Sequence, residues 1–222
     1  MKNISTLNRA EVILFLEQCK KYPQDNQLEL KANGTVAGYL EPIGGTYSQN
    51  DITLLTKWRA ANQTWFPSQF NVTRGGTETW LVNQVINNHT KILYMIKDIQ
   101  GNSIGHLGLA GLDFVHDTCD LDNVIKGEDN IGNNVMVLAE KKMVELAFSV
   151  FGTKSVRAQL FDDNLPSKLL QFSLGFKVDK KISMMKRVED NGVFWDEIPK
   201  GQIKSIPAER YFLHMMKYKE MI

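Results

Sequence analysis

The sequence lacks the features that mark secreted, metal-stapled and membrane-spanning proteins. Its two cysteines, Cys19 and Cys119, are too few for a disulfide framework, and no Cys/His run has zinc-ligand spacing. The N-terminal apolar run Val12–Leu16 is too short for a signal peptide or a membrane span. We therefore expect a cytoplasmic protein without a metal site, in which both thiols are buried or half-buried; a nucleophilic Cys119 is the alternative.

The sequence also lacks an excess of charge of either sign. Lysine and arginine number 26 against 25 acidic residues, which gives a formal net charge of +1. Such a balance creates no long-range field that would attract nucleic acid or an anionic membrane. We expect neither as a partner, and any charged ligand must be recognised locally.

The chain is long enough, at 222 residues and 43% hydrophobic, to bury a sizeable core. Asn8 and Glu11 have the spacing of a capping box, which predicts a helix to about Lys21, and Thr35–Pro42 has the composition of a strand. We expect residues 1–50 to form an appendage to a domain over 51–222, the two making one compact unit.

Helices and strands then alternate in a pattern that predicts a layered fold. Two helical stretches, from Asp51 and over Thr77–Asn87, flank an aromatic loop that contains Trp65 and Phe66. The loop is expected in the core, with the wall of a substrate pocket as the alternative. Further strands are expected over Lys91–Lys97, Ser103–Leu109, Thr118–Lys126, Lys154–Phe161, Phe176–Met184 and Glu209–Lys217, with helices over Val135–Val150 and Leu165–Leu174 and an insertion over Val188–Pro207.

This order predicts an α+β fold in which helices flank a mixed, mostly antiparallel sheet. One connection, Gly127–Asn134, is polar and precedes the long helix. Its backbone N–H groups have no intrahelical acceptor, and the helix dipole adds partial positive charge there. Such a turn suits a pyrophosphate.

From Asp51 to Lys217 the sequence resembles the GNAT superfamily of acyl-CoA N-acyltransferases. The family's phosphate motif, Arg/Gln-x-x-Gly-x-Gly/Ala, corresponds to Asp129-Asn-Ile-Gly132-Asn-Asn134, where only Gly132 matches. A second family segment, Asn-x-x-Ala-x-x-x-Tyr-x-x-x-Gly-Phe, is better matched by Asn164, Gly175 and Phe176, with Ser167 in register. The alternative interpretation is that Asn164 is an ordinary helix N-cap and Gly175-Phe176 an ordinary helix end, as found in unrelated α/β proteins.

The resemblance implies a cleft for acetyl-CoA as acyl donor. It assigns the pyrophosphate to the turn, the pantetheine and the thioester carbonyl to the backbone of a splayed third strand, and the thioester end to the short helix. The cofactor-binding residues that it implies are Gly132, Asn133 and Asn134 in the turn, Asn123, Val124 and Ile125 in the strand, and Asn164, Ser167, Lys168 and Phe172 in the helix.

The family's usual catalytic side chains are replaced in this sequence. Gln171 stands where many members have the tyrosine that protonates the leaving thiolate, and Gln159 stands at a common place for a carboxylate base. Asp120 and Asp122 are two residues apart on a strand and so share a face, which favours a site or, alternatively, ion pairs. We expect Asp122 as the catalytic base and His106, on the neighbouring strand, as the second candidate.

The acceptor is expected to be a small primary amine. The third strand and the Trp58-Arg59 pair are similar to family members that acetylate nucleotide-linked amino sugars for surface polysaccharides, although the Trp-Arg pair is equally similar to acetyltransferases of protein N-termini. A non-catalytic acyl-CoA-binding module is the third reading, and a homodimer is compatible with the resemblance. The side chains expected to recognise the acceptor are Trp65, Arg74, Trp195 and Arg210.

Overall fold

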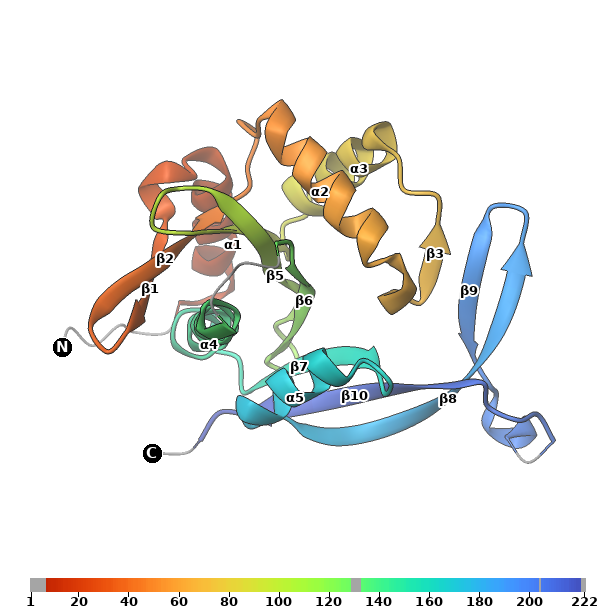
Figure 1. Cartoon of the computed structure of the whole chain (residues 1–222). Coiled ribbons are helices and arrows are strands. Elements are labelled where there is room, and N and C mark those ends of the chain that lie inside the picture. The colour runs from red at the N-terminus through yellow and green to blue at the C-terminus, as the bar shows by residue number, and fades with distance from the viewer. Residues whose placement is uncertain (1–6, 129–132, 204, 221–222) are drawn as a thin grey trace.

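A computed structural model describes residues 7–128, 133–203 and 205–220 (Figure 1). Within them a ten-stranded sheet has the order β1-β2-β4-β5-β6-β7-β10-β8-β9-β3. All neighbouring strands are antiparallel except β6 and β7, which are parallel. The strands are β1 Leu28–Ala32, β2 Thr35–Pro42, β3 Ser68–Phe70, β4 Ile92–Lys97, β5 Ser103–Asp113, β6 Thr118–Lys126, β7 Ser155–Phe161, β8 Lys177–Glu189, β9 Gly192–Glu197 and β10 Arg210–Tyr218.

Helices cover the sheet, which confirms the predicted α+β class (Figure 1). One face is covered by α1 and α4, and their apolar side chains form the main core with strand residues such as Leu109, Leu121 and Val156. A second core, which includes Trp58 and Ile125, lies under α2 and α3 on the opposite face. The helices are α1 Arg9–Lys21, α2 Gln49–Ala61, α3 Arg74–Trp80, α4 Asn133–Ser149 and α5 Leu165–Ser173; a π-helix, Leu81–Ile86, continues α3.

The first 50 residues share the sheet and the core with the rest of the chain. The capping box of Asn8 and Glu11 is formed as expected, and Val12 and Leu16 of α1 lie in the main core. The strand β1, which we did not predict, pairs with β2 through a tight turn, and β2 pairs with β4. Asn33 and Gly34 form that turn with φ of 50° and 82°, values that Asn and Gly tolerate best.

The polar segment expected as an insertion, residues 188–207, contains strand structure. β8 extends to Glu189, and β9 returns antiparallel to it and also pairs with β3, inside the expected aromatic loop. Gly192 permits this approach, because a Cβ there would lie 2.3 Å from the carbonyl oxygen of Gln69. The β8–β9 hairpin therefore joins the far end of the sheet to the segment that follows α2.

No helix among the described residues combines the length and apolar character needed to cross a membrane. In the same residues, no three His, Cys, Asp or Glu side chains gather as metal ligands.

Gly127 offers a test of how α2 is seated on the sheet. A Cβ at Gly127 would lie 2.2 Å from the indole ring of Trp58, which is 1% exposed. We expect Gly127→Ala to lower stability by about 1–3 kcal/mol, the usual cost of overpacking. Thermal unfolding measures the effect, with Gly45→Ala as the control because a Cβ there meets nothing within 4 Å. Equal melting temperatures for the two variants would contradict this packing.

Candidate active site

The sheet opens between its two parallel strands. The β6–β7 pairing joins Thr118–Leu121 to Ser155–Ala158, and beyond Leu121 and Ala158 no further pairs form among the described residues. β6 also has a bulge opposite β5, where Asn123 adopts a φ of 52°. A cleft of about 400 Å³ lies at the opening; its lining is Asn62, Trp65, Phe66, Pro67, Asp120–Lys126, Ala158, Gln159, Leu160, Asn164, Pro166, Ser167, Gln171 and Phe212.

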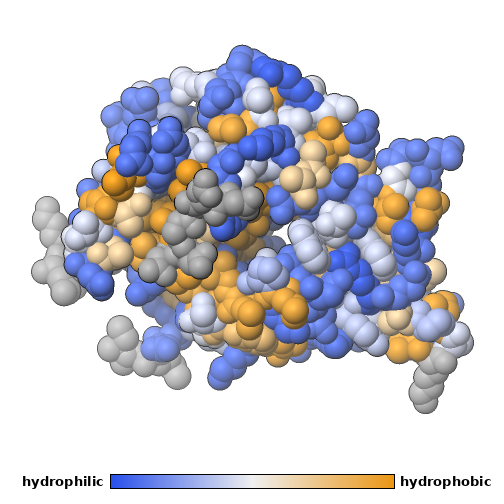
Figure 2. All heavy atoms as spheres, in the orientation of Figure 1, coloured by the Kyte–Doolittle hydropathy of each residue, from blue (hydrophilic) through white to orange (hydrophobic). Residues whose placement is uncertain are grey.

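The cleft is lined from both faces of the sheet. Leu121 and Leu160 belong to the main core beside α4 and α5, so alternation along the strands places Asp120, Asp122 and Gln159 on the opposite face. α5 contributes Asn164, Ser167 and Gln171 from the first face, and the segment after α2 contributes the aromatic residues from the second. Figure 2 shows the surface hollowed between the half that carries α2 and the half that carries α5.

Both strand carboxylates are neutralised by cations. The guanidinium of Arg157 donates to Asp120 through Nε and Nη2, at 2.6 and 2.8 Å, and this contact raises the pKa of Arg157. Lys91 Nζ lies 2.6 Å from Asp122 Oδ2, and the Lys91 side chain is only 13% exposed. The two aspartates therefore share one face of the sheet as predicted, and each is held in an ion pair, which was the alternative interpretation of the sequence.

Further positive charge lies behind this face. The guanidinium of Arg59 stacks over the Trp80 ring at 3.9 Å, and Lys91 Nζ lies 5.7 Å from the same ring. Burial lowers the pKa of Arg59 from its ordinary value without removing its charge at neutral pH. The two aspartates of this half of the cleft are therefore accompanied by three cations, Arg157, Lys91 and Arg59.

His106 lies on the same face of the sheet as Asp122 but is covered by α2. Its side chain is 0% exposed and packs against Trp58, with ring centroids 6.0 Å apart. Burial lowers the pKa of His106 to about 4, so the imidazole is neutral at pH 7. His106 is not among the residues that line the cleft.

A buried polar pair lies at the α5 side of the cleft. Gln171 Nε2 donates to Glu140 Oε2 at 2.7 Å, and the two side chains are 4% and 0% exposed. Burial raises the pKa of Glu140 from 4.5 to about 8. We did not predict a role for Glu140, although its position was a signal: it lies one turn from Met136 and Met143, on the apolar stripe of α4.

The other predicted residues divide into three groups. Asn123, Val124, Ile125, Asn164 and Ser167 line the cleft, and Asn164 caps α5 by accepting from the Ser167 N–H at 3.3 Å. Lys168 pairs instead with Asp162, and Phe172 is 44% exposed; neither lines the cleft. Gly132 lies outside the described residues, and Asn133 and Asn134 are described only as the start of α4.

The side chains expected to recognise an acceptor are partly engaged within the protein. Arg210 is paired with Asp163 at 2.9 Å and stacked over Phe161 at 3.7 Å. Arg74 donates to Thr53 at 2.9 Å. Of the four side chains expected to recognise an acceptor, only Trp65 lines the cleft.

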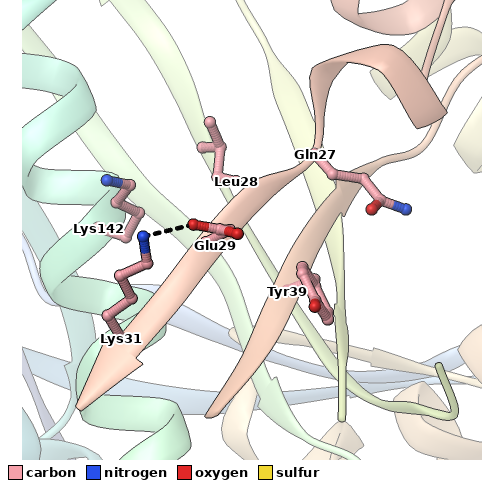
Figure 3. A pocket seen from close by; sticks show the side chains of 6 residues that line it. All are labelled: Gln27, Leu28, Glu29, Lys31, Tyr39 and Lys142. Carbon is pink, nitrogen blue, oxygen red and sulfur yellow. Dashed lines mark ion pairs between the residues drawn. The ribbon is translucent and has the colours of Figure 1, made fainter. Parts of the chain in front are cut away.

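A second hollow, of about 550 Å³, lies beside β1 and β2 and is lined by Gln27, Leu28, Glu29, Lys31, Tyr39 and Lys142 (Figure 3). Lys142 reaches it from α4, and the other side chains come from β1, β2 and the residue before β1. The one ion pair drawn joins Glu29 and Lys31 at 2.6 Å. This hollow lies apart from the opening between β6 and β7.

The family comparison agrees with this geometry. The acetyltransferase (GNAT) domain family matches residues 46–177, more than half of the chain. The chain belongs to the GNAT family. It is therefore an acyl-CoA-dependent N-acyltransferase, and acetyl-CoA is its acyl donor.

Solved GNAT structures share the fold at low sequence identity. A GCN5-related N-acetyltransferase from Brucella melitensis is 15% identical with a TM-score of 0.62, over 86% of this chain and 78% of that one. A probable GNAT acetyltransferase from Chromobacterium violaceum is 14% identical with a TM-score of 0.61, over 86% and 85%. The spermidine/spermine N-acetyltransferase of Vibrio cholerae is 12% identical with a TM-score of 0.58, over 81% and 92%. Comparison with curated protein sequences finds no match.

The cleft fits the pantetheine arm of acetyl-CoA. Past Leu121, β6 presents backbone that has no strand partner on its β7 side, and such groups are available to a ligand that carries amides. On the α5 side, Gln171 Oε1 is buried without a hydrogen-bond partner in the described structure.

Glu140 predicts a particular dependence of stability on pH. Because its pKa is raised on folding, the neutral carboxyl contributes stability that is fully present below about pH 4.5 and is lost as pH rises through about 8. We expect the stability advantage of Glu140→Gln over the wild type to grow as the pH rises through this range, to a few kcal/mol in total, at about 1.4 kcal/mol per pKa unit. Above about pH 8 this advantage should stay constant. Denaturant unfolding at several pH values measures this, with the exposed Glu145→Gln as control. A difference independent of pH would contradict the assignment.

Proposed function

We propose that this GNAT transfers the acetyl group of acetyl-CoA to the primary amine of a nucleotide-linked amino sugar. The observation that carries the proposal is the pairing of the acceptor-side carboxylates: Asp120 is bound by Arg157 and Asp122 by Lys91. With Arg59 behind them and Lys126 on the lining, this half of the cleft favours an acceptor with anionic groups, such as a nucleotide diphosphate.

The aromatic wall supports the same acceptor. Trp65 and Phe66, with Pro67, border the cleft on the face that carries Asp122. Flat apolar side chains suit the stacking of a sugar ring or a base. The combination of an aromatic wall and compensated carboxylates is therefore suited to a sugar nucleotide.

Other acceptors fit the charges and shape of this cleft less well. A polyamine, the substrate in the name of the Vibrio cholerae neighbour, carries several positive charges and would need unpaired carboxylates. A protein N-terminus would require a groove for extended peptide, whereas the β3–β9 pairing crosses beside the aromatic wall. A cofactor-binding module without catalysis is set aside because the chain belongs to the GNAT acetyltransferase family, although Gln171 replaces the usual tyrosine.

The chemistry follows from the two faces of the opening. When bound, acetyl-CoA supplies an activated acetyl carbonyl. We propose that the backbone N–H groups of Val124 or Ile125 polarise that carbonyl, and that Asp122 accepts a proton from the attacking amine. Lys91 keeps Asp122 in place at the edge of the cleft. His106 is left out of the proposal because it is covered by Trp58.

The protein is proposed to act in the cytoplasm. Cys19 and Cys119 are both free and buried, as expected in a reducing compartment.

Acceptor choice is tested by thiol release from acetyl-CoA with nucleotide-linked amino sugars, spermidine and short peptides offered in parallel. We expect the highest kcat/KM with a nucleotide-linked amino sugar, and a loss of about tenfold or more when the nucleotide is removed, as for the loss of a charged contact. A higher kcat/KM for spermidine or for peptide N-termini would refute this acceptor. Absence of thiol release with the nucleotide-linked amino sugar would refute it as well.

The role of Asp122 is tested in the same assay. We expect Asp122→Asn to lower kcat about 100-fold or more near neutral pH, the usual contribution of a positioned base. Asp179→Asn, on the exposed part of β8, is the matched control and should leave kcat unchanged. A wild-type rate in Asp122→Asn would remove Asp122 from the mechanism.

A further inference from the structure

Arg59 of α2 is a half-buried cation that has no anionic partner in the described structure. Its guanidinium stacks on the ring of Trp80, 3.9 Å from the ring centroid. Burial lowers the pKa of Arg59, and no carboxylate or hydrogen bond from a described residue raises it again. A charge that is partly removed from water is normally paired, and a guanidinium carries several N–H donors. The unused donors of Arg59 therefore indicate a ligand.

The carboxylates of the surrounding elements are already engaged. Asp51, the one acidic residue of α2, belongs to the capping box of that helix. Glu78, the one acidic residue of α3, accepts from the hydroxyl of Tyr47 at 3.0 Å. Across the cleft, Asp120 and Asp122 are each held by another cation. The positive charge on the Trp80 ring is therefore left for a group that comes from outside these elements.

This charge lies beside the acceptor half of the cleft. α2 and α3 lie side by side over the sheet (Figure 1), and the ring of Trp80 also lies 5.7 Å from Lys91 Nζ. Lys91 binds Asp122, which lines the cleft, and so does Asn62 at the end of α2, three residues after Arg59. Arg59 and the proposed base Asp122 are thus separated by Lys91 and one aromatic ring.

The position suits the anionic part of the proposed acceptor. In a nucleotide-linked amino sugar, carbon atoms of the sugar separate the amine from the diphosphate. An anion site must then lie near Asp122 but apart from it, as Arg59 does. The flat guanidinium presents parallel N–H donors, which match two oxygens of a phosphate. Stacking on Trp80 restrains this orientation before a ligand binds, which reduces the entropy lost on binding.

We propose that the guanidinium of Arg59, held on the ring of Trp80, binds the diphosphate of the acceptor by charge-assisted hydrogen bonds. The inference rests on the proposed function and names the residue that selects its substrate class. Lys91 adds a second positive charge near the same ring while it holds Asp122 in place. Arg59 takes no part in the bond changes of acyl transfer, so its contribution is to acceptor affinity.

The test measures binding, so it needs no turnover. Calorimetry gives the affinity of the protein for the diphosphates of uridine, cytidine, thymidine and guanosine, and for the four nucleosides without phosphate. The protein is first saturated with coenzyme A, so that the diphosphate site of the cofactor is occupied. For each base, the ratio of the two affinities isolates the contribution of the diphosphate. The variants are Arg59→Gln, which removes the charge, and Arg59→Lys, which keeps it without the planar fork.

Arg9→Gln is the matched control for the loss of one positive charge. Arg9 also lies over an aromatic ring, 5.3 Å from the centroid of Phe114. It belongs to α1, which covers the opposite face of the sheet. A change in Arg59→Gln that is absent from Arg9→Gln is therefore local to Arg59.

We expect the wild type to bind at least one nucleoside diphosphate about tenfold or more tightly than its nucleoside, the value of a charged hydrogen-bonded contact. Arg59→Gln should lose most of this preference, and Arg59→Lys should lose less of it. Arg9→Gln should keep the ratio of the wild type. The affinity for coenzyme A should be the same in all four proteins, which also reports that each variant is folded.

A wild-type ratio in Arg59→Gln would overturn the inference and leave the proposed acceptor standing. An equal loss in Arg9→Gln would overturn it as well, because net charge alone would then explain the effect. If the wild type binds none of the diphosphates more tightly than the nucleosides, the nucleotide-linked acceptor and this inference both fail. Should Arg59→Gln not fold, Arg59→Lys decides: a reduced ratio supports the inference, and an unchanged ratio overturns it.

Discussion

The end of hydrogen bonding between β6 and β7 is the constraint on which the site depends. A parallel pair inside a sheet normally satisfies the backbone of both strands, but here the pairing stops after Leu121 and Ala158. β5 continues to hold β6 on its other edge, with a bulge that changes the direction of the strand at Asn123. The released edge of β6 is backbone in the interior of a folded protein, and ligand amides can pair with it.

The two faces of this opening are lined by different elements. α5 contributes Asn164, Ser167 and Gln171 on one face, while the segment after α2 contributes an aromatic wall on the other. The two faces also differ in their polar groups. The α5 side carries the buried Glu140–Gln171 pair, and the other side carries the ion pairs of Asp120 and Asp122. The two sides of the opening therefore offer different chemistry, as the proposed transfer between a donor and an acceptor requires.

The sequence predicted most of the elements around the opening because their signals are local. The Asn164 cap, the bounds of β6 and the central position of β10 all follow from short patterns. β1, β3 and β9 were missed: β1 alternates leucine with charge over only five residues, β3 is three residues long inside the expected aromatic loop, and β9 lies in a polar segment. Their pairing depends on strands distant in the sequence, which propensity does not reveal.

The roles of the site residues were less predictable, because they depend on contacts between elements. Alternation placed Asp122 on the same face of its strand as Asp120, but nothing near it in sequence indicated Lys91 as its partner. His106 shares that face, and only the packing of Trp58 shows that α2 covers it. Glu140 was visible as a charge on an apolar helical stripe, yet its partner Gln171 lies on another helix.

The central claim is that the opening between β6 and β7 is the acetyl-CoA cleft, and a crystal structure of the protein with bound coenzyme A tests it most directly. We expect the pantetheine arm to pass between the two strands, with its amides on the β6 backbone past Leu121 and its sulfur beside Gln171. Coenzyme A bound in the hollow beside β1 and β2, or elsewhere on the surface with the opening left free, would contradict the account.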